Sequence, residues 1–183
     1  MITREEALRR IKNHVKNRNL VKHMIAVSAI MCGLAERLGE DPDLWTAVGM
    51  LHDIDYEEVG DDWDRHGLVS ADMVSDALPD DGLHAIKAHN PRTGFEAQSR
   101  MDWALIAADA LSGLVVATAL MMPDKKLATV KVRSLRRKFK DSSFARGVSR
   151  DNMVQCEKLG ISLDEFFSIG LSSMQAVSGE LGV

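Results

Sequence analysis

Apolar residues recur every three or four positions along most of this chain, which is the spacing of one face of an α-helix. Helices are expected over about residues 3–15, 19–39, 42–52, 66–78, 80–89, 99–120 and 162–177, with one or two more within 125–140. Residues 54–64 are acidic and aperiodic, which predicts a loop. No stretch shows the alternation of a β-strand between turn signals.

Local signals at several helix ends support these boundaries. Thr3 and Ser162 are each followed three residues later by glutamate, the spacing of a capping box. Gly39 follows the second helix, where a glycine commonly ends one, and Asp41-Pro42 is a typical start for the third. We therefore predict an all-α bundle of roughly eight helices.

Length and composition fit one globular domain over residues 1–183. A chain of 183 residues with a 45% hydrophobic fraction is long enough and apolar enough to bury a core. The N-terminus lacks an apolar signal core. Residues 101–120 approach transmembrane length, but Asp102 and Asp109 favour a buried core helix. Two cysteines, Cys32 and Cys156, provide no disulfide framework. We expect a soluble cytoplasmic protein with no membrane partner.

Charge is distributed unevenly along the chain. Residues 125–140 contain eight Lys or Arg and no acid, and the remainder holds 15 basic and 27 acidic residues. A local basic block on an acidic protein argues against general nucleic-acid binding and is compatible with a small anionic ligand. A solvated helix face is the structural alternative for these side chains.

Polar residues interrupt three of the predicted apolar helices. His23 shares a face with Val27 and Ile30, His52 and Asp53 end the third helix, and Asp109 lies within an apolar run. A buried carboxylate needs a cation, several donors or a proton. One divalent metal would compensate these residues together, because imidazole and carboxylate are both good ligands for such ions. Taken singly, each residue could instead have a structural role.

The order His23, then His52-Asp53, then Asp109 resembles the H…HD…D signature of the HD-domain superfamily of metal-dependent phosphohydrolases. The resemblance covers residues 20 to 120, with the HD pair at a helix end and the last aspartate in mid-helix, as that family has them. It implies an HD-like helical fold, with a core at 20–120 and a C-terminal helical extension at 123–183. It also implies that His23, His52, Asp53 and Asp109 bind a metal.

Two further histidines resemble the extra ligands of two-metal members of that superfamily. His66 precedes a predicted helix, and His89 matches the first histidine of a His-His segment, although Asn90 stands where the second would be. By this resemblance His66 and His89 bind a second ion and Asp53 bridges the two. His84, about 140° from His89 around the helix, is interpreted as a surface residue, and His14 is given no role.

The resemblance implies hydrolysis of a small phosphate ester, with metal-bound hydroxide as the nucleophile. The cofactor is expected to be one or two divalent ions (Mn, Fe, Co, Ni, Zn or Mg), since no thiolate takes part. Asp53 and Asp55 are the catalytic candidates, and Asp55 would orient the water or accept its proton. The candidates for holding the substrate phosphate are basic: Lys125, Lys126, Arg133, Lys138, Arg146 and Arg150.

The acidic loop 54–64 connects two presumed ligands and so is expected at the rim of the site. It would repel a large polyanion, which favours a phosphomonoester or nucleotide monophosphate as the substrate. A homodimer is one option, and its contact residues would be apolar: Met121, Met122, Phe166, Phe167 and Met174.

Three alternative functions remain at this point. A di-iron oxygenase would use the same six ligands, and a nucleotide-binding signalling module would show little turnover. A structural protein whose histidines only pack would bind no metal, but it would leave Asp109 without a counter-charge.

Overall fold

The computed structural model describes residues 2–183, and within that range it contains helices and turns but no strand, which confirms the all-α prediction. Eight α-helices have six residues or more, as predicted: α1 (Arg4–His14), α2 (Arg18–Leu38), α3 (Pro42–Leu51), α5 (Leu68–Met73), α6 (Asp80–Ala88), α7 (Arg100–Leu120), α8 (Val132–Lys140) and α10 (Leu163–Ala176). The shorter elements are α4 (Tyr56–Val59), α9 (Arg150–Val154), α11 (Ser178–Leu181) and the 3-10 turns η1 (Pro91–Thr93), η2 (Leu127–Thr129) and η3 (Gln155–Leu159).

Most predicted helix ends are confirmed by their caps. The Thr3 and Ser162 hydroxyls accept hydrogen bonds from the backbone N–H groups three residues later, and Gly39 has a left-handed φ of 71°. Two predictions need correction. The predicted loop 54–64 contains helix α4, and the helix predicted over 66–78 is confined to α5, because Gly67 before it has a φ of 89° that interrupts a helix.

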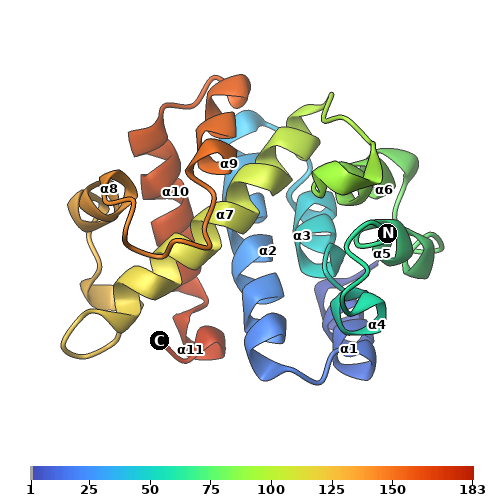
Figure 1. Cartoon of the computed structure of the whole chain (residues 1–183), viewed down its shortest axis with the longest axis horizontal. Coiled ribbons are helices and arrows are strands. Elements are labelled where there is room, and N and C mark those ends of the chain that lie inside the picture. Colours follow the sequence, from blue (N-terminus) through green and yellow to red (C-terminus); the bar gives the residue numbers. More distant parts are fainter. Residues whose placement is uncertain (1) are drawn as a thin grey trace.

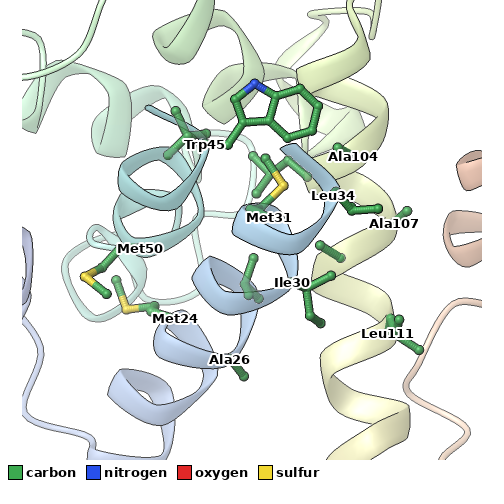
Figure 2. Close-up of a cluster of buried hydrophobic side chains, with 14 of the residues drawn as sticks. Met24, Ala26, Ile30, Met31, Leu34, Trp45, Met50, Ala104, Ala107 and Leu111 are labelled. Carbon is green, nitrogen blue, oxygen red and sulfur yellow. The ribbon is translucent and has the colours of Figure 1, made fainter. Parts of the chain in front are cut away.

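Helix α2 lies at the centre of the fold, between α3 on one side and α7 on the other (Figures 1 and 2). Ile30, Met31 and Leu34 of α2 are fully buried there against the two neighbouring helices. Gly49 lets α3 approach α2 closely, because a β-carbon at this position would lie 2.9 Å from both the Met31 side chain and the Ser28 backbone. This close packing places the C-terminal end of α3 beside the N-terminal half of α2.

The C-terminal region joins the same core. One hydrophobic cluster extends from Ile2 to Leu181, and Phe166, Phe167 and Met174 of α10 are fully buried in it. These three residues are therefore not available for the dimer contact considered from the sequence. Met121 is 65% exposed, and a homodimer remains a prediction.

Helix α7 meets the length and composition of a membrane span, as its sequence indicated. Its most apolar window is 61% buried within the structure, where α7 packs against α2, α6 and α10. Within residues 2–183 no other helix has such length and composition. The burial is that of a core helix, whereas the cytoplasmic location remains a prediction.

Substitution of Gly49 by alanine tests the packing of α2 on α3. We expect Gly49→Ala to lower the free energy of unfolding by about 1–3 kcal/mol in urea denaturation, because the added methyl group overpacks the contact. Gly179→Ala is the matched control, since a β-carbon there meets no atom within 4 Å. An equal effect of the two substitutions would contradict the proposed close contact.

Candidate metal centre

The structure brings all six predicted metal ligands together. His23 comes from α2, His52 and Asp53 from the end of α3, His66 from the segment before α5, His89 from the end of α6 and Asp109 from the middle of α7. The Asp53 carboxylate is central. Its Oδ1 lies 3.3 Å from the Nε2 atoms of His52 and His66 and 3.4 Å from His89 Nε2, whereas its Oδ2 lies 3.4 Å from His23 Nε2.

Two sets of three donor atoms are close enough to share an ion. In His23, His52 and Asp109, and likewise in His52, Asp53 and His89, the donor atoms lie within 4.8 Å of one another. His23 Nε2 and Asp109 Oδ1 are 3.1 Å apart, as are His66 Nε2 and His89 Nε2. His52 belongs to both sets and therefore lies between the two candidate positions.

Helix ends orient two of the histidines. His52 is the C-cap of α3 and its Nδ1 lies 2.9 Å from the Gly49 carbonyl oxygen, while His89 is the C-cap of α6 and its Nδ1 contacts the Ile86 carbonyl oxygen. The last carbonyls of a helix lack a partner within it, so each imidazole supplies the missing donor. Each of the two rings therefore carries its proton on Nδ1 and presents a lone pair on Nε2 to the centre.

Side-chain oxygens orient the other two histidines. The Ser112 hydroxyl donates to the Asp109 carbonyl oxygen (2.8 Å), so its lone pair accepts from His23 Nδ1 at 3.1 Å. The Asp55 carboxylate accepts from His66 Nδ1 at 2.8 Å. All four rings thus direct Nε2 at one another and at Asp53, the orientation that second-shell partners impose on metal-ligating histidines.

These donor atoms fit divalent ions. His52 Nε2 is buried and has no hydrogen-bond partner, a costly arrangement unless a cation accepts its lone pair. Two ligand atoms each about 2.0–2.1 Å from a metal, at an angle of about 90–110°, lie roughly 2.8–3.4 Å apart. The separations among His66 Nε2, His89 Nε2 and Asp53 Oδ1 are 3.1, 3.3 and 3.4 Å. The residues therefore match the spacing that an ion requires.

Without a metal, the aspartates of the centre keep protons on two of its histidines. Burial opposes protonation of His23 and His66, but Asp109 and Asp53 raise the pKa of His23 to about 10, and Asp53 and Asp55 raise that of His66 to about 9. His52, in contrast, has its pKa lowered to about 4 by burial. Burial would raise the pKa of the Asp53 carboxyl, but the surrounding histidines hold it well below its usual range. The carboxylate is therefore ionised and ready to bind a cation.

Asp55 does not face the centre, contrary to the role predicted for it. Its carboxylate is fully buried, with Oδ1 on His66 and Oδ2 accepting from the backbone N–H groups of Gly67 and Ser70. Because both oxygens are engaged, Asp55 positions His66 rather than orienting a water molecule.

Asn90, which follows His89, also positions ligands. Its side-chain amide donates to the carbonyl oxygens of Trp63 (2.7 Å) and His66 (2.9 Å), and so ties the segment before α5 to the end of α6. The residue that departs from the two-metal pattern is therefore engaged in holding one of the ligands in place.

The centre opens into a cleft of about 520 Å³. Asp109 reaches this opening, and its side chain is 35% exposed, which corrects the expectation of a fully buried carboxylate. Five of the six candidate ligands line the cleft: His23, Asp53, His66, His89 and Asp109. The other lining residues are mainly apolar or aromatic: Leu20, Tyr56, Trp63, Asn90, Pro91 and Gly147.

Most of the predicted phosphate ligands lie away from the cleft. Lys125, Lys126, Arg133 and Lys138 belong to the segment after α7 and to α8, on the left in Figure 1, opposite α4 and α6. Arg150 donates to backbone carbonyls instead. Arg146 alone among the six is adjacent to a residue of the cleft, Gly147.

Several residues of the site carried no signal of their own in the sequence. Tyr56 and Trp63, in the acidic segment, have rings 5.2 Å apart, and both border the cleft. Ser112 could have been found as the residue one helical turn after Asp109. The two remaining histidines lie outside the centre, since His84 pairs with Asp102 at 3.1 Å and His14 is exposed.

Metal binding should release protons. At neutral pH the metal-free centre holds protons on His23 and His66, whose pKa values lie above 7, and a metal requires both rings to be neutral. Affinity for Mn²⁺ should therefore rise with pH, by about tenfold per unit for each proton displaced. Titration calorimetry at pH 6 to 8.5, in buffers of different ionisation enthalpy, measures both quantities. An affinity independent of pH would contradict the assignment.

The Asp55→Asn variant tests the positioning of His66. Asparagine carries no negative charge and has only one acceptor oxygen, so it cannot accept from His66 and from both backbone N–H groups. We therefore expect the affinity for the second ion to fall by about 10–100-fold. The first ion should bind almost as before. Asp102→Asn is the matched control, a buried aspartate that pairs with a histidine outside the centre. Equal losses in both variants would indicate general destabilisation instead.

Comparison with known proteins agrees with this geometry. The pattern of one family, described as HD domain, matches residues 20–114, which is more than half of the chain and includes all six candidate ligands. Neither the curated proteins nor the solved structures provided a significant match. The HD domain indicates a superfamily of the metal-dependent phosphohydrolase type, and the buried His and Asp groups are compatible with divalent metals. The chain belongs to the HD domain family.

Proposed function

We propose that the protein is a metal-dependent phosphohydrolase that cleaves a small phosphate ester, such as a nucleotide or another phosphomonoester. The observation that carries the proposal is the convergence of four imidazole Nε2 atoms on Asp53 at the base of an open cleft, with His52 Nε2 left without a partner. A purely structural cluster would use that lone pair in a hydrogen bond.

The candidate ligands would divide between two ions, with the Asp53 carboxylate within reach of both sets. His23, His52 and Asp109 would hold one ion, and His66 with His89 would hold the other. When bound, such ions lower the pKa of water and offset the negative charge of phosphoryl oxygens. Asp109, whose side chain is partly exposed at the cleft, would hold the first ion where a substrate phosphate in the cleft can reach it.

The volume and the lining of the cleft suit a small organic substrate. Its volume of about 520 Å³ lies within the usual range of small-molecule sites. Tyr56 and Trp63 offer aromatic surface on one wall, which suits a planar or apolar group attached to the phosphate.

Metal content and phosphate release test the proposal together. We expect about two equivalents of transition metal per chain, and release of phosphate from nucleoside monophosphates or aryl phosphates by the Mn²⁺- or Co²⁺-loaded protein. His52→Gln and Asp53→Asn should reduce the rate by more than about 100-fold, because they remove ligands rather than their supports. His84→Gln, which lies outside the centre, should retain the rate.

Other outcomes would favour the alternatives. Iron with an absorbing oxidised state and no phosphate release would support an oxygenase. Tight nucleotide binding without turnover would support a signalling module. Absence of metal after incubation with Mn²⁺ or Co²⁺ would contradict every catalytic interpretation of the centre.

A further inference from the structure

Two further cavities continue the main cleft along helix α7. The first, of about 260 Å³, shares His23, Asp109 and Gly147 with the cleft. The second, of about 450 Å³, shares His23 and Gly113 with the first. Asp109 and Gly113 lie one helical turn apart, so both cavities follow the same face of α7. The space beside the metal centre therefore extends beyond it, towards the C-terminal end of this helix.

The larger cavity, called here the α7 groove, is lined by the uncovered face of α7. From Ala110 to Leu120 the residues of the helix that are not buried recur at helical spacing, are small or apolar, and all line the groove: Gly113, Val116, Ala117 and Leu120. Leu120 is 50% exposed. The solvent side of a helix in a globular protein usually carries polar residues. An apolar stripe in that position is typical of a surface that binds a ligand or a partner.

Helix α2 and the C-terminal segment form the opposite walls of the α7 groove. Ala26 of α2 and Leu181 of α11 line it and are buried. The Lys22 ammonium lies beside Gly182, where an added β-carbon would be 2.9 Å from Nζ. The half-buried stem of Lys22 thus covers part of the wall with methylene groups. Asn19 also lines the groove and is exposed to solvent.

The polar groups at the end near the metal centre are already satisfied. His23 and Ser112 both line the α7 groove. The Ser112 hydroxyl donates to the Asp109 carbonyl oxygen at 2.8 Å and accepts from His23 Nδ1 at 3.1 Å. Neither the hydroxyl nor Nδ1 keeps a proton to donate to a ligand. This end of the groove therefore suits a group that makes no hydrogen bonds and gains free energy by leaving water.

The direction of the α7 groove suits an extended group. From Asp109 to Leu120 the helix rises by about 16 Å, at about 1.5 Å per residue. A chain attached to a phosphate at the metal centre could follow this face and bury its methylene groups against Ala117 and Leu120. The groove meets the centre at His23, and this continuity assigns it to the substrate rather than to a second copy of the protein.

We propose that the α7 groove binds an aliphatic chain of the substrate. The inference rests on the proposed phosphohydrolase function, which places the reacting phosphate at the metal centre. It narrows the substrate class to phosphate esters of aliphatic alcohols, with the chain lying along α7 from Gly113 to Leu120.

Alkylphosphonates of increasing length test this without requiring turnover. Calorimetry on the Mn²⁺-loaded full chain would compare unbranched chains of two to ten carbons, each below the concentration at which it forms micelles. Each methylene that enters the groove should tighten binding about three- to fourfold, the usual gain for a CH₂ group removed from water. The affinity should become constant once the groove is filled.

Two variants with matched controls locate the chain. Ala117→Met fills the middle of the groove and should abolish the dependence on length beyond the first few methylenes, whereas Ala176→Met, at an exposed position of α10, should retain it. Leu120→Ser should remove only the gain from the longest chains. Met121→Ser is its control, because Met121 is 65% exposed and does not line the groove.

Several outcomes would overturn the inference. These are equal affinity at every chain length, or a full length dependence in both Ala117→Met and Leu120→Ser. A dimer in sedimentation experiments that Leu120→Ser dissociates would assign the face to a second copy instead. No binding of any phosphonate would contradict the inference and the proposed function together. A length dependence that Ala117→Met abolishes, in a protein that releases no phosphate, would sustain the groove and contradict only the proposed hydrolysis.

Discussion

Four imidazole rings direct their Nε2 atoms at one shared carboxylate, Asp53, and this crowding of donor atoms governs the chemistry of the centre. Each of the four rings is held through Nδ1 by a protein oxygen, so Nε2 is the only atom left to meet the centre. Neutral rings in that arrangement repel one another and Asp53, and His52 Nε2 has no partner. Protons on His23 and His66 relieve this in part, whereas divalent cations would relieve it fully. Positive charge, carried by protons or by cations, therefore stabilises the centre.

The helices of the fold position and orient the side chains of this centre. Helices α3 and α6 both end in a histidine whose Nδ1 bonds a carbonyl of the last turn, so helix ends, which lack internal partners, become supports for ligands. Helix α2 contributes His23 from its N-terminal half and α7 contributes Asp109 from its middle, where apolar packing fixes the backbone. The close approach at Gly49 brings the end of α3 to His23. The helix packing that buries the apolar residues therefore also orients the polar ones.

The basic C-terminal segment is divided between structure and surface. Arg150 and Lys138 hold the loop 141–149 beside the centre, and Arg136 pairs with Asp164 on α10. Lys125 and Lys126 belong to the segment after α7 and Arg133 belongs to α8, and Figure 1 shows this part of the chain on the side of the fold away from α4. A dense block of positive charge in the sequence therefore does not form a single anion site. Neighbouring residues of one helix point in different directions and meet different partners.

The helical class and most helix ends were predictable from the sequence, and the resemblance to the HD family supplied the six candidate metal ligands. Apolar periodicity and caps depend on residues within one turn, and a His or Asp within an apolar helix requires compensation wherever that helix packs. Tertiary structure alone decided that Asp55 supports His66, that Asn90 ties the segment before α5 to α6, and that Ser112 holds His23. It also gave two nearby arginines different surroundings, because Arg146 is exposed whereas Arg150 donates to backbone carbonyl oxygens. Such roles depend on which segments, distant in the chain, come within hydrogen-bond distance, and local sequence does not specify that distance.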